Sequence, residues 1–118
     1  MNHKDLDAWK MAMELAETVY RLTKNFPKEE IYGLTSQARR AVVSVPSNLS
    51  EGAARSSAKE MHHFLDYAVG SLAELETQLL LAQRLSYFSE ASVFDSINST
   101  RALILGLRRS LRSRMGEM

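Results

Sequence analysis

A long row of apolar residues between positions 57 and 86 sets the strictest limit on how this sequence folds. The row advances in alternating steps of four and three residues, at Met61, Leu65, Ala68, Leu72, Leu75, Leu79 and Ala82. Such steps place every member on one face of an α-helix, and they are typical of helices that pack at shallow angles. The row predicts a helix roughly 45 Å long, at about 1.5 Å per residue. Ser57 and Glu60 are predicted to form a capping box at its start.

Three further segments show helical periodicity, and the chain shows almost no strand signal. The predicted helices cover about 5–24, 33 to about 52–55, and about 89 to the last few residues, where 115–118 are expected to fray. The connectors between them are short. Four amphipathic helices joined in this way predict an all-α protein, a single antiparallel four-helix bundle over residues 1–118 with up-down-up-down topology.

The first predicted helix carries two adjacent apolar rows. One holds Leu6, Trp9, Met13, Ala16 and Tyr20, and the other holds Ala12, Leu15, Val19 and Leu22. Both rows are expected to face the core, so Trp9 and Tyr20 are predicted to pack there rather than to stack on nucleobases. In the last helix, Ser89 is predicted to act as the N-cap, with Glu90 in the first turn. The core row of that helix is predicted to be Val93, Ile97, Thr100, Ile104, Leu107 and Leu111.

The second predicted helix contains a proline near its middle. Pro46 has no backbone N–H, and its ring crowds the carbonyl group four residues earlier, at a cost of about 3 kcal/mol unless the surrounding structure absorbs a kink. We therefore predict a proline-kinked helix that its neighbours hold in place. Its expected core row is Ala38, Ala41, Val45 and Leu49, which turns Val43 outward.

Small and apolar residues are also predicted on surfaces that face away from the core. On the long third helix, Gly70 lies opposite the apolar row. A glycine inside a helix costs about 1 kcal/mol relative to alanine, and the close approach of another backbone would account for it. We predict that copies of the same chain cover this surface. The interface candidates are Val43, Gly70, Ala73, Thr77, Leu80 and Leu81.

Composition limits the chemistry that is available to the chain. The 118 residues include no cysteine, which excludes disulfide bonds, a catalytic thiolate and cysteine-ligated zinc. Apolar residues make up 45% and charged residues 25%, the balance of an ordinary soluble globular domain. No apolar run approaches the ~20 residues that span a bilayer, and the N-terminus has no basic-then-apolar leader. We expect a soluble, cytoplasmic protein with no membrane partner.

Basic residues gather towards the end of a chain whose net charge is only +1. Between Asp95 and Glu117 every charged residue is an arginine. When a weak basic patch is repeated around an oligomeric ring, the contacts of all copies with a polyanion add up. The candidate nucleic-acid contacts are Arg39, Arg40, Arg55, Arg101, Arg108, Arg109 and Arg112. In the alternative interpretation, these arginines serve solubility, complement the helix dipole and pair with acids of neighbouring subunits.

Enzyme chemistry finds little support in the sequence. Glu60 and His63 form a Glu-x-x-His step, which supplies ligands to paired metal sites in ferritin-like bundles. No second copy of the step exists, and Glu60 already has a capping role. Neither a Gly-x-Ser-x-Gly elbow nor a phosphate-binding glycine loop is present. We expect no catalytic residue, metal or cofactor, and a metal-dependent bundle enzyme is the remote alternative.

Two stretches of the sequence resemble a known family. Segment 33–52, which reads GLTSQARRAVVSVPSNLSEG, and segment 70–79 are similar to those of the four-helix bundle proteins associated with intervening sequences of 23S rRNA genes. Residues 5–9 and 26–30 also fit, so the resemblance covers nearly the whole chain. Relatives of that family include the accessory proteins of diversity-generating retroelements, which form a pentameric barrel and work with a reverse transcriptase and its RNA.

The resemblance implies a bundle that assembles as a homopentamer, with Arg39 and Arg40 inside the matching motif as candidate polyanion contacts. We therefore expect a non-enzymatic, homo-oligomeric scaffold or adaptor. It is expected to bind structured RNA or a nucleic-acid-handling protein through basic surface residues. The alternative is a protein-only interaction module with no nucleic-acid role.

Overall fold

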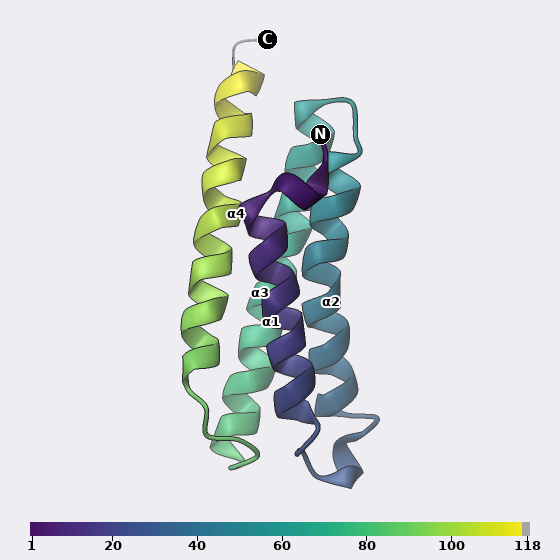
Figure 1. Ribbon diagram of the computed structural model, residues 1–118, viewed down its shortest axis with the longest axis vertical. Helices are drawn as coiled ribbons and strands as arrows, with labels where there is room; N and C mark the ends of the chain where they lie inside the picture. Colours follow the sequence, from purple (N-terminus) through teal and green to yellow (C-terminus); the bar gives the residue numbers. More distant parts are fainter. Residues whose placement is uncertain (117–118) are drawn as a thin grey trace.

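The computed structural model describes residues 1–116, and these residues form four long helices (Figure 1). The helices are α1 (Asp7–Thr23), α2 (Leu34–Ala53), α3 (Ala58–Arg84) and α4 (Ser92–Gly116), with 3-10 turns η1 (His3–Asp5) and η2 (Lys28–Glu30) before α1 and α2. No strand occurs within the described range, and the predicted all-α class is confirmed. Residues 117–118, part of the segment expected to fray, lie outside that range. None of the described helices is long and apolar enough to pass through a membrane.

Each helix packs against two others in a bundle that measures 51 × 22 × 20 Å along its principal axes. Helix α1 contacts α2 and α4, and α3 contacts the same two helices, so α1 and α3 lie on one diagonal of the cross-section. Figure 1 shows successive helices that run in opposite directions. The α1–α2 and α3–α4 connectors therefore lie together at one end, the lower end in Figure 1.

The predicted apolar rows of α2, α3 and α4 form the core. All seven members of the α3 row are buried, and so are the four members of the α2 row, which Val42 and Pro46 join. The buried members of the α4 row are Val93, Ile97, Thr100, Ile104 and Leu111, and the half-buried Leu107 packs against them. Helical periodicity was sufficient to locate this part of the core.

The prediction for α1 was partly wrong. The buried line of this helix is the second row together with Ala8, whereas Met13 and Tyr20 of the first row are each 40% exposed. Trp9 is half-buried and packs against the core. Among the long helices α1 contacts α2 and α4, and these two neighbours cover a narrower sector of α1 than both rows span. Tyr20 therefore lies at the edge of the α1–α2 contact instead of in the core.

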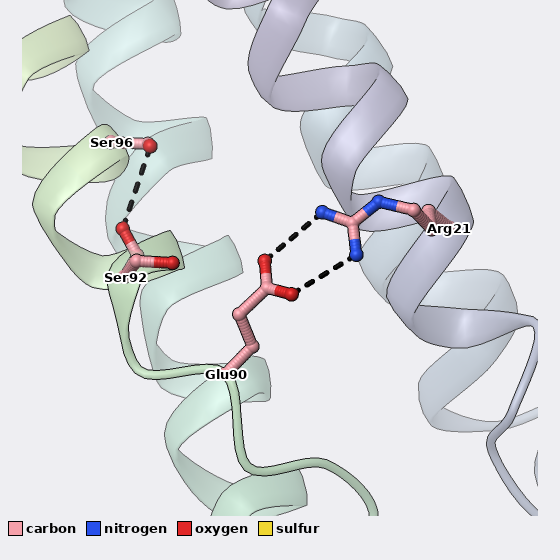
Figure 2. A network of polar contacts seen from close by, with 4 residues as sticks. All are labelled: Arg21, Glu90, Ser92 and Ser96. Atoms are coloured by element: carbon pink, nitrogen blue, oxygen red, sulfur yellow. Dashed lines mark hydrogen bonds and ion pairs between the residues drawn. The ribbon is translucent and has the colours of Figure 1, made fainter.

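The predicted start of α4 was also wrong. The helix begins at Ser92, three residues after Ser89, and its first turn contains Asp95. Glu90 lies ahead of the helix, and its carboxylate reaches across to α1, where Arg21 donates two hydrogen bonds of 3.0 Å (Figure 2). Figure 2 also shows the Ser96 hydroxyl directed at the Ser92 carbonyl, 3.5 Å away within the first turn of α4.

The start of α3 and the interior of α2 follow the sequence more closely. The Ser57 hydroxyl accepts a hydrogen bond from the Glu60 backbone amide over 3.1 Å, which is the predicted N-cap contact. Pro46 lies buried inside α2, which is helical from Leu34 to Ala53 on both sides of the ring. The kink expected at Pro46 stays a prediction.

Candidate functional site

Two arginines of the predicted basic row on α4 lie against α3 and are paired with acids. Arg101 donates to the Glu76 carboxylate over 3.1 Å, and Arg108 donates to the Asp66 carboxylate over 2.7 Å. Their side chains are only 24% and 28% exposed. These two cations are therefore largely neutralised within the chain, and they link α4 to α3.

The other arginines of α4 are placed differently. Arg109 and Arg112 are exposed, and neither forms an ion pair with any residue in the range 1–116.

Arg55, in the connector between α2 and α3, lies with its guanidinium 4.8 Å from the centre of the Phe64 ring. An exposed contact of this kind holds the guanidinium in place and leaves its charge without a counter-ion.

Arg39 is fixed at the lower end of the bundle by two residues of α1. Its Nε atom donates to the Thr23 hydroxyl over 2.9 Å, and its guanidinium lies 4.7 Å from the centre of the Tyr20 ring. The Thr23 hydroxyl in turn donates to the Val19 carbonyl over 2.8 Å. Sequence reasoning missed Tyr20 and Thr23 as partners of Arg39, because only the packing of α1 on α2 brings together residues 16 or more positions apart.

The surface around Arg39 is hollowed on both sides. One open hollow of about 420 Å³ is lined by Tyr20, Ile31, Thr35, Ser36, Arg39, Arg40 and Val43. A second, of about 260 Å³, is lined by Thr23, Lys24, Phe26, Pro27, Lys28, Ile31, Thr35 and Arg39. The two hollows share Ile31, Thr35 and Arg39. We call the pair the α1–α2 groove.

The predicted interface residues fall on two separate surfaces. Five of them, Gly70, Ala73, Thr77, Leu80 and Leu81, are exposed on α3. Val43 is 42% exposed on α2, as its outward orientation predicted, and it lies beside Tyr20 in the α1–α2 groove. None of the five α3 residues lines either hollow of that groove, so Val43 and the α3 residues belong to different parts of the surface.

Titratable groups at the lower end are held by hydrogen bonds. The bidentate contact with Arg21 lowers the pKa of the Glu90 carboxyl, and the same contact raises the pKa of Arg21.

At the opposite end of the bundle, His62 lies with its Nδ1 atom 3.5 Å from the Asp66 carboxylate, while His63 is exposed. Among residues 1–116, no three potential metal-ligating His, Asp or Glu side chains gather in one place.

The fold and these surfaces define a small helical bundle with unpaired cations towards both ends and an exposed small-residue face on α3. Residues 4–108 match the family model of the 23S rRNA-intervening sequence protein. The chain belongs to this family, and the resemblance seen in the sequence is confirmed. A comparison with curated proteins gave no match.

Proposed function

We propose that this protein is a non-enzymatic, cytoplasmic scaffold that assembles as a homo-oligomer, with five subunits as the family resemblance implies. In this proposal the assembly binds structured RNA, or a protein that handles RNA, through exposed arginines. The observation that carries the proposal is that Arg40, Arg109 and Arg112 are exposed and have no acidic partner among the described residues. On a chain of net charge +1, such local cations need repetition to act on a polyanion.

Self-association is supported by the surface of α3. Leu80 and Leu81 are 44% and 48% exposed, and they stand beside small residues that let another helix approach closely. A closed ring with an odd number of subunits requires two different patches on each copy, because each contact joins unlike surfaces. The exposed α3 face supplies one of these two patches.

A protein-only interaction module is the second candidate. The observation in its favour is that Arg101 and Arg108 are engaged with Glu76 and Asp66. Only part of the predicted basic row is therefore available to phosphate groups. In this case the ring would display a docking surface for a different protein.

The two candidates are separated by measurements of mass and RNA binding on the same preparation. We expect light scattering to give an oligomer, and binding to a structured RNA to weaken steeply with salt. The double variant Arg109→Glu/Arg112→Glu should reduce the slope of log K against log salt by about two, one unit for each phosphate contact. The matched control Lys10→Glu/Lys59→Glu, which makes the same change in net charge at two exposed positions, should bind nearly as the wild type.

Contradicting results are equally specific. A monomer at high concentration would overturn the scaffold. Binding that is absent, or that does not respond to salt, would overturn the RNA role. A co-purifying protein that survives nuclease treatment, with no RNA binding, would support the interaction module instead.

A further inference from the structure

We propose that the α1–α2 groove is a binding site for a short unpaired segment of RNA, a proposal that rests on the RNA-binding function above. Arg39, Arg40, Lys24 and Lys28 hold the phosphates, and the ring of Tyr20 contacts a base. The site includes Arg39 and Arg40 of the sequence candidates, adds Lys24, Lys28 and Tyr20, and leaves out the arginines of α4. Three features support this site: the charge of the groove, the fixation of Arg39 and the exposure of Tyr20.

All the charged residues that line the groove are cations. Lys24, Lys28 and Arg39 line one hollow, Arg39 and Arg40 line the other, and no carboxylate lines either of them. The hollow between α1 and α4 is a contrast, since it is lined by Glu14 and Asp95 and by no cation. A groove of uniform positive charge that tracks along two adjoining hollows is complementary to successive phosphates of one strand.

Arg39 is prepared to bind an anion without rearrangement. A guanidinium has five N–H donors. The contact with Thr23 uses the one on Nε, and a longer contact of 3.5 Å from Nη2 to the Tyr20 carbonyl uses another, so three remain without a partner among residues 1–116. The Cζ atom of the Arg39 guanidinium lies 4.7 Å from the centre of the Tyr20 ring. No carboxylate within residues 1–116 pairs with this guanidinium. Arg101 and Arg108 are unlike Arg39 in this respect, because each already donates to an acid. A fixed guanidinium with free donors loses little entropy when a phosphate arrives.

The apolar lining of the groove indicates why the strand is unpaired. Tyr20, Val43 and Ile31 are 40%, 42% and 59% exposed around the same hollow. In single strands the bases are free to stack on aromatic rings and on arginine planes, whereas in a duplex they are stacked on each other. Tyr20 together with Arg39 offers both kinds of surface at one point. A second copy of this chain is the competing occupant, and the experiment distinguishes it.

The test uses two labelled probes, a 12-nucleotide oligouridylate and a 12-base-pair RNA duplex, with the full-length protein and fluorescence anisotropy over a salt series. The wild type should bind the oligouridylate more tightly than the duplex. Arg40→Gln should lower the salt slope by about one. Tyr20→Leu should weaken binding about fivefold to a hundredfold with the salt slope unchanged, because it removes stacking and no charge. Tyr20→Phe keeps the ring and should bind as the wild type does.

Arg109→Gln/Arg112→Gln is the control on α4, and the mass of every variant is measured by light scattering. If Arg40→Gln and Tyr20→Leu bind as the wild type while the α4 variant loses RNA, the groove proposal is wrong and the proposed function stands. If the duplex binds as well as the single strand, the unpaired-strand site is wrong. A change of mass in Arg40→Gln, with RNA affinity retained, would identify the groove as a contact between copies. If neither probe binds to the wild type, both proposals fail.

Discussion

The phenol of Tyr87 donates a hydrogen bond of 2.8 Å to the Glu30 carboxylate, which ties the connector after α3 to the turn before α2. The other carboxylate oxygen of Glu30 accepts the backbone N–H of Leu34 over 3.0 Å, at the first residue of α2. The hydrogen bond from Leu34 and the one from Tyr87 lower the pKa of the Glu30 carboxyl. The same contact with Glu30 raises the pKa of the Tyr87 phenol. One carboxylate thus caps a helix and joins two connectors.

Glu30→Gln is expected to lower stability at neutral pH and to flatten its acid dependence. A carboxyl with a folded-state pKa below its unfolded value contributes stability that is present above the unfolded pKa and is lost as the pH falls through the folded pKa. For Glu30 this loss begins near the ordinary value of 4.5 and continues below it. The difference in melting temperature between wild type and Glu30→Gln, measured from pH 7 to pH 3, should shrink as the pH falls. A constant difference would contradict this role.

Tyr87→Phe is the matched control for that measurement. It removes the phenol but leaves the bond from Leu34 to Glu30 in place. Its acid dependence should therefore lie between those of the wild type and Glu30→Gln, closer to the wild type because the Leu34 bond is the larger cause of the lowered pKa.

The Arg21–Glu90 pair is expected to couple α1 to the start of α4 only weakly. Both side chains are well exposed, and exposed ion pairs are screened by water and salt. A double-mutant cycle with Arg21→Ala and Glu90→Ala should give a small favourable coupling that declines from 20 mM to 1 M salt. A large coupling that persists at high salt would show that the pair is protected from solvent.

Substitutions of two helical glycines by alanine should have opposite effects. A Cβ atom on Gly52 would lie 2.9 Å from the Cβ of Phe64, so Gly52→Ala forces α2 and α3 apart, and we expect a net loss of about 1 kcal/mol in the free energy of unfolding. Nothing lies within 4 Å of the corresponding position on Gly70. In the dissociated chain, for example on the Leu81→Glu background, Gly70→Ala should raise the unfolding free energy by about 0.5–1 kcal/mol. Urea unfolding measures both, and equal effects would contradict the close approach at Gly52.

A charge on the exposed face of α3 should dissociate the assembly without unfolding the chain. Leu81→Glu places a carboxylate on that face, where Leu81 is 48% exposed, and should lower the mass measured by light scattering. Leu103→Glu on α4, at 36% exposure and outside the predicted interface, is the control and should leave the mass unchanged. Equal masses for Leu81→Glu and the wild type would remove α3 from the interface.

Truncation of a central core residue should be costly. Leu72 is fully buried in the row of α3 that faces the other helices. Leu72→Ala should lower the free energy of unfolding by about 2–5 kcal/mol, since it removes apolar contacts and leaves a cavity. Chemical denaturation monitored by circular dichroism measures the loss, and a cost below 1 kcal/mol would show that the core collapses around the site.

The helices and most of the core were predictable from the sequence. The α3 row, the α2 row and the outward position of Val43 follow from periodicity alone, because the angle between residues on a helix is set by the backbone. The Ser57 cap was equally predictable, since its partner is three residues away. These features depend on contacts within one element.

The contacts between side chains of different helices depend on the tertiary structure. It places Tyr20 at an edge beside Arg39, pairs Arg101 and Arg108 with α3, and brings Glu90 to Arg21. These outcomes depend on how far each neighbouring helix covers the next and on the rotation of one helix against another. Helical periodicity fixes the direction of a side chain relative to the axis of its own helix. It carries no information on which residue of a neighbouring helix lies opposite that side chain.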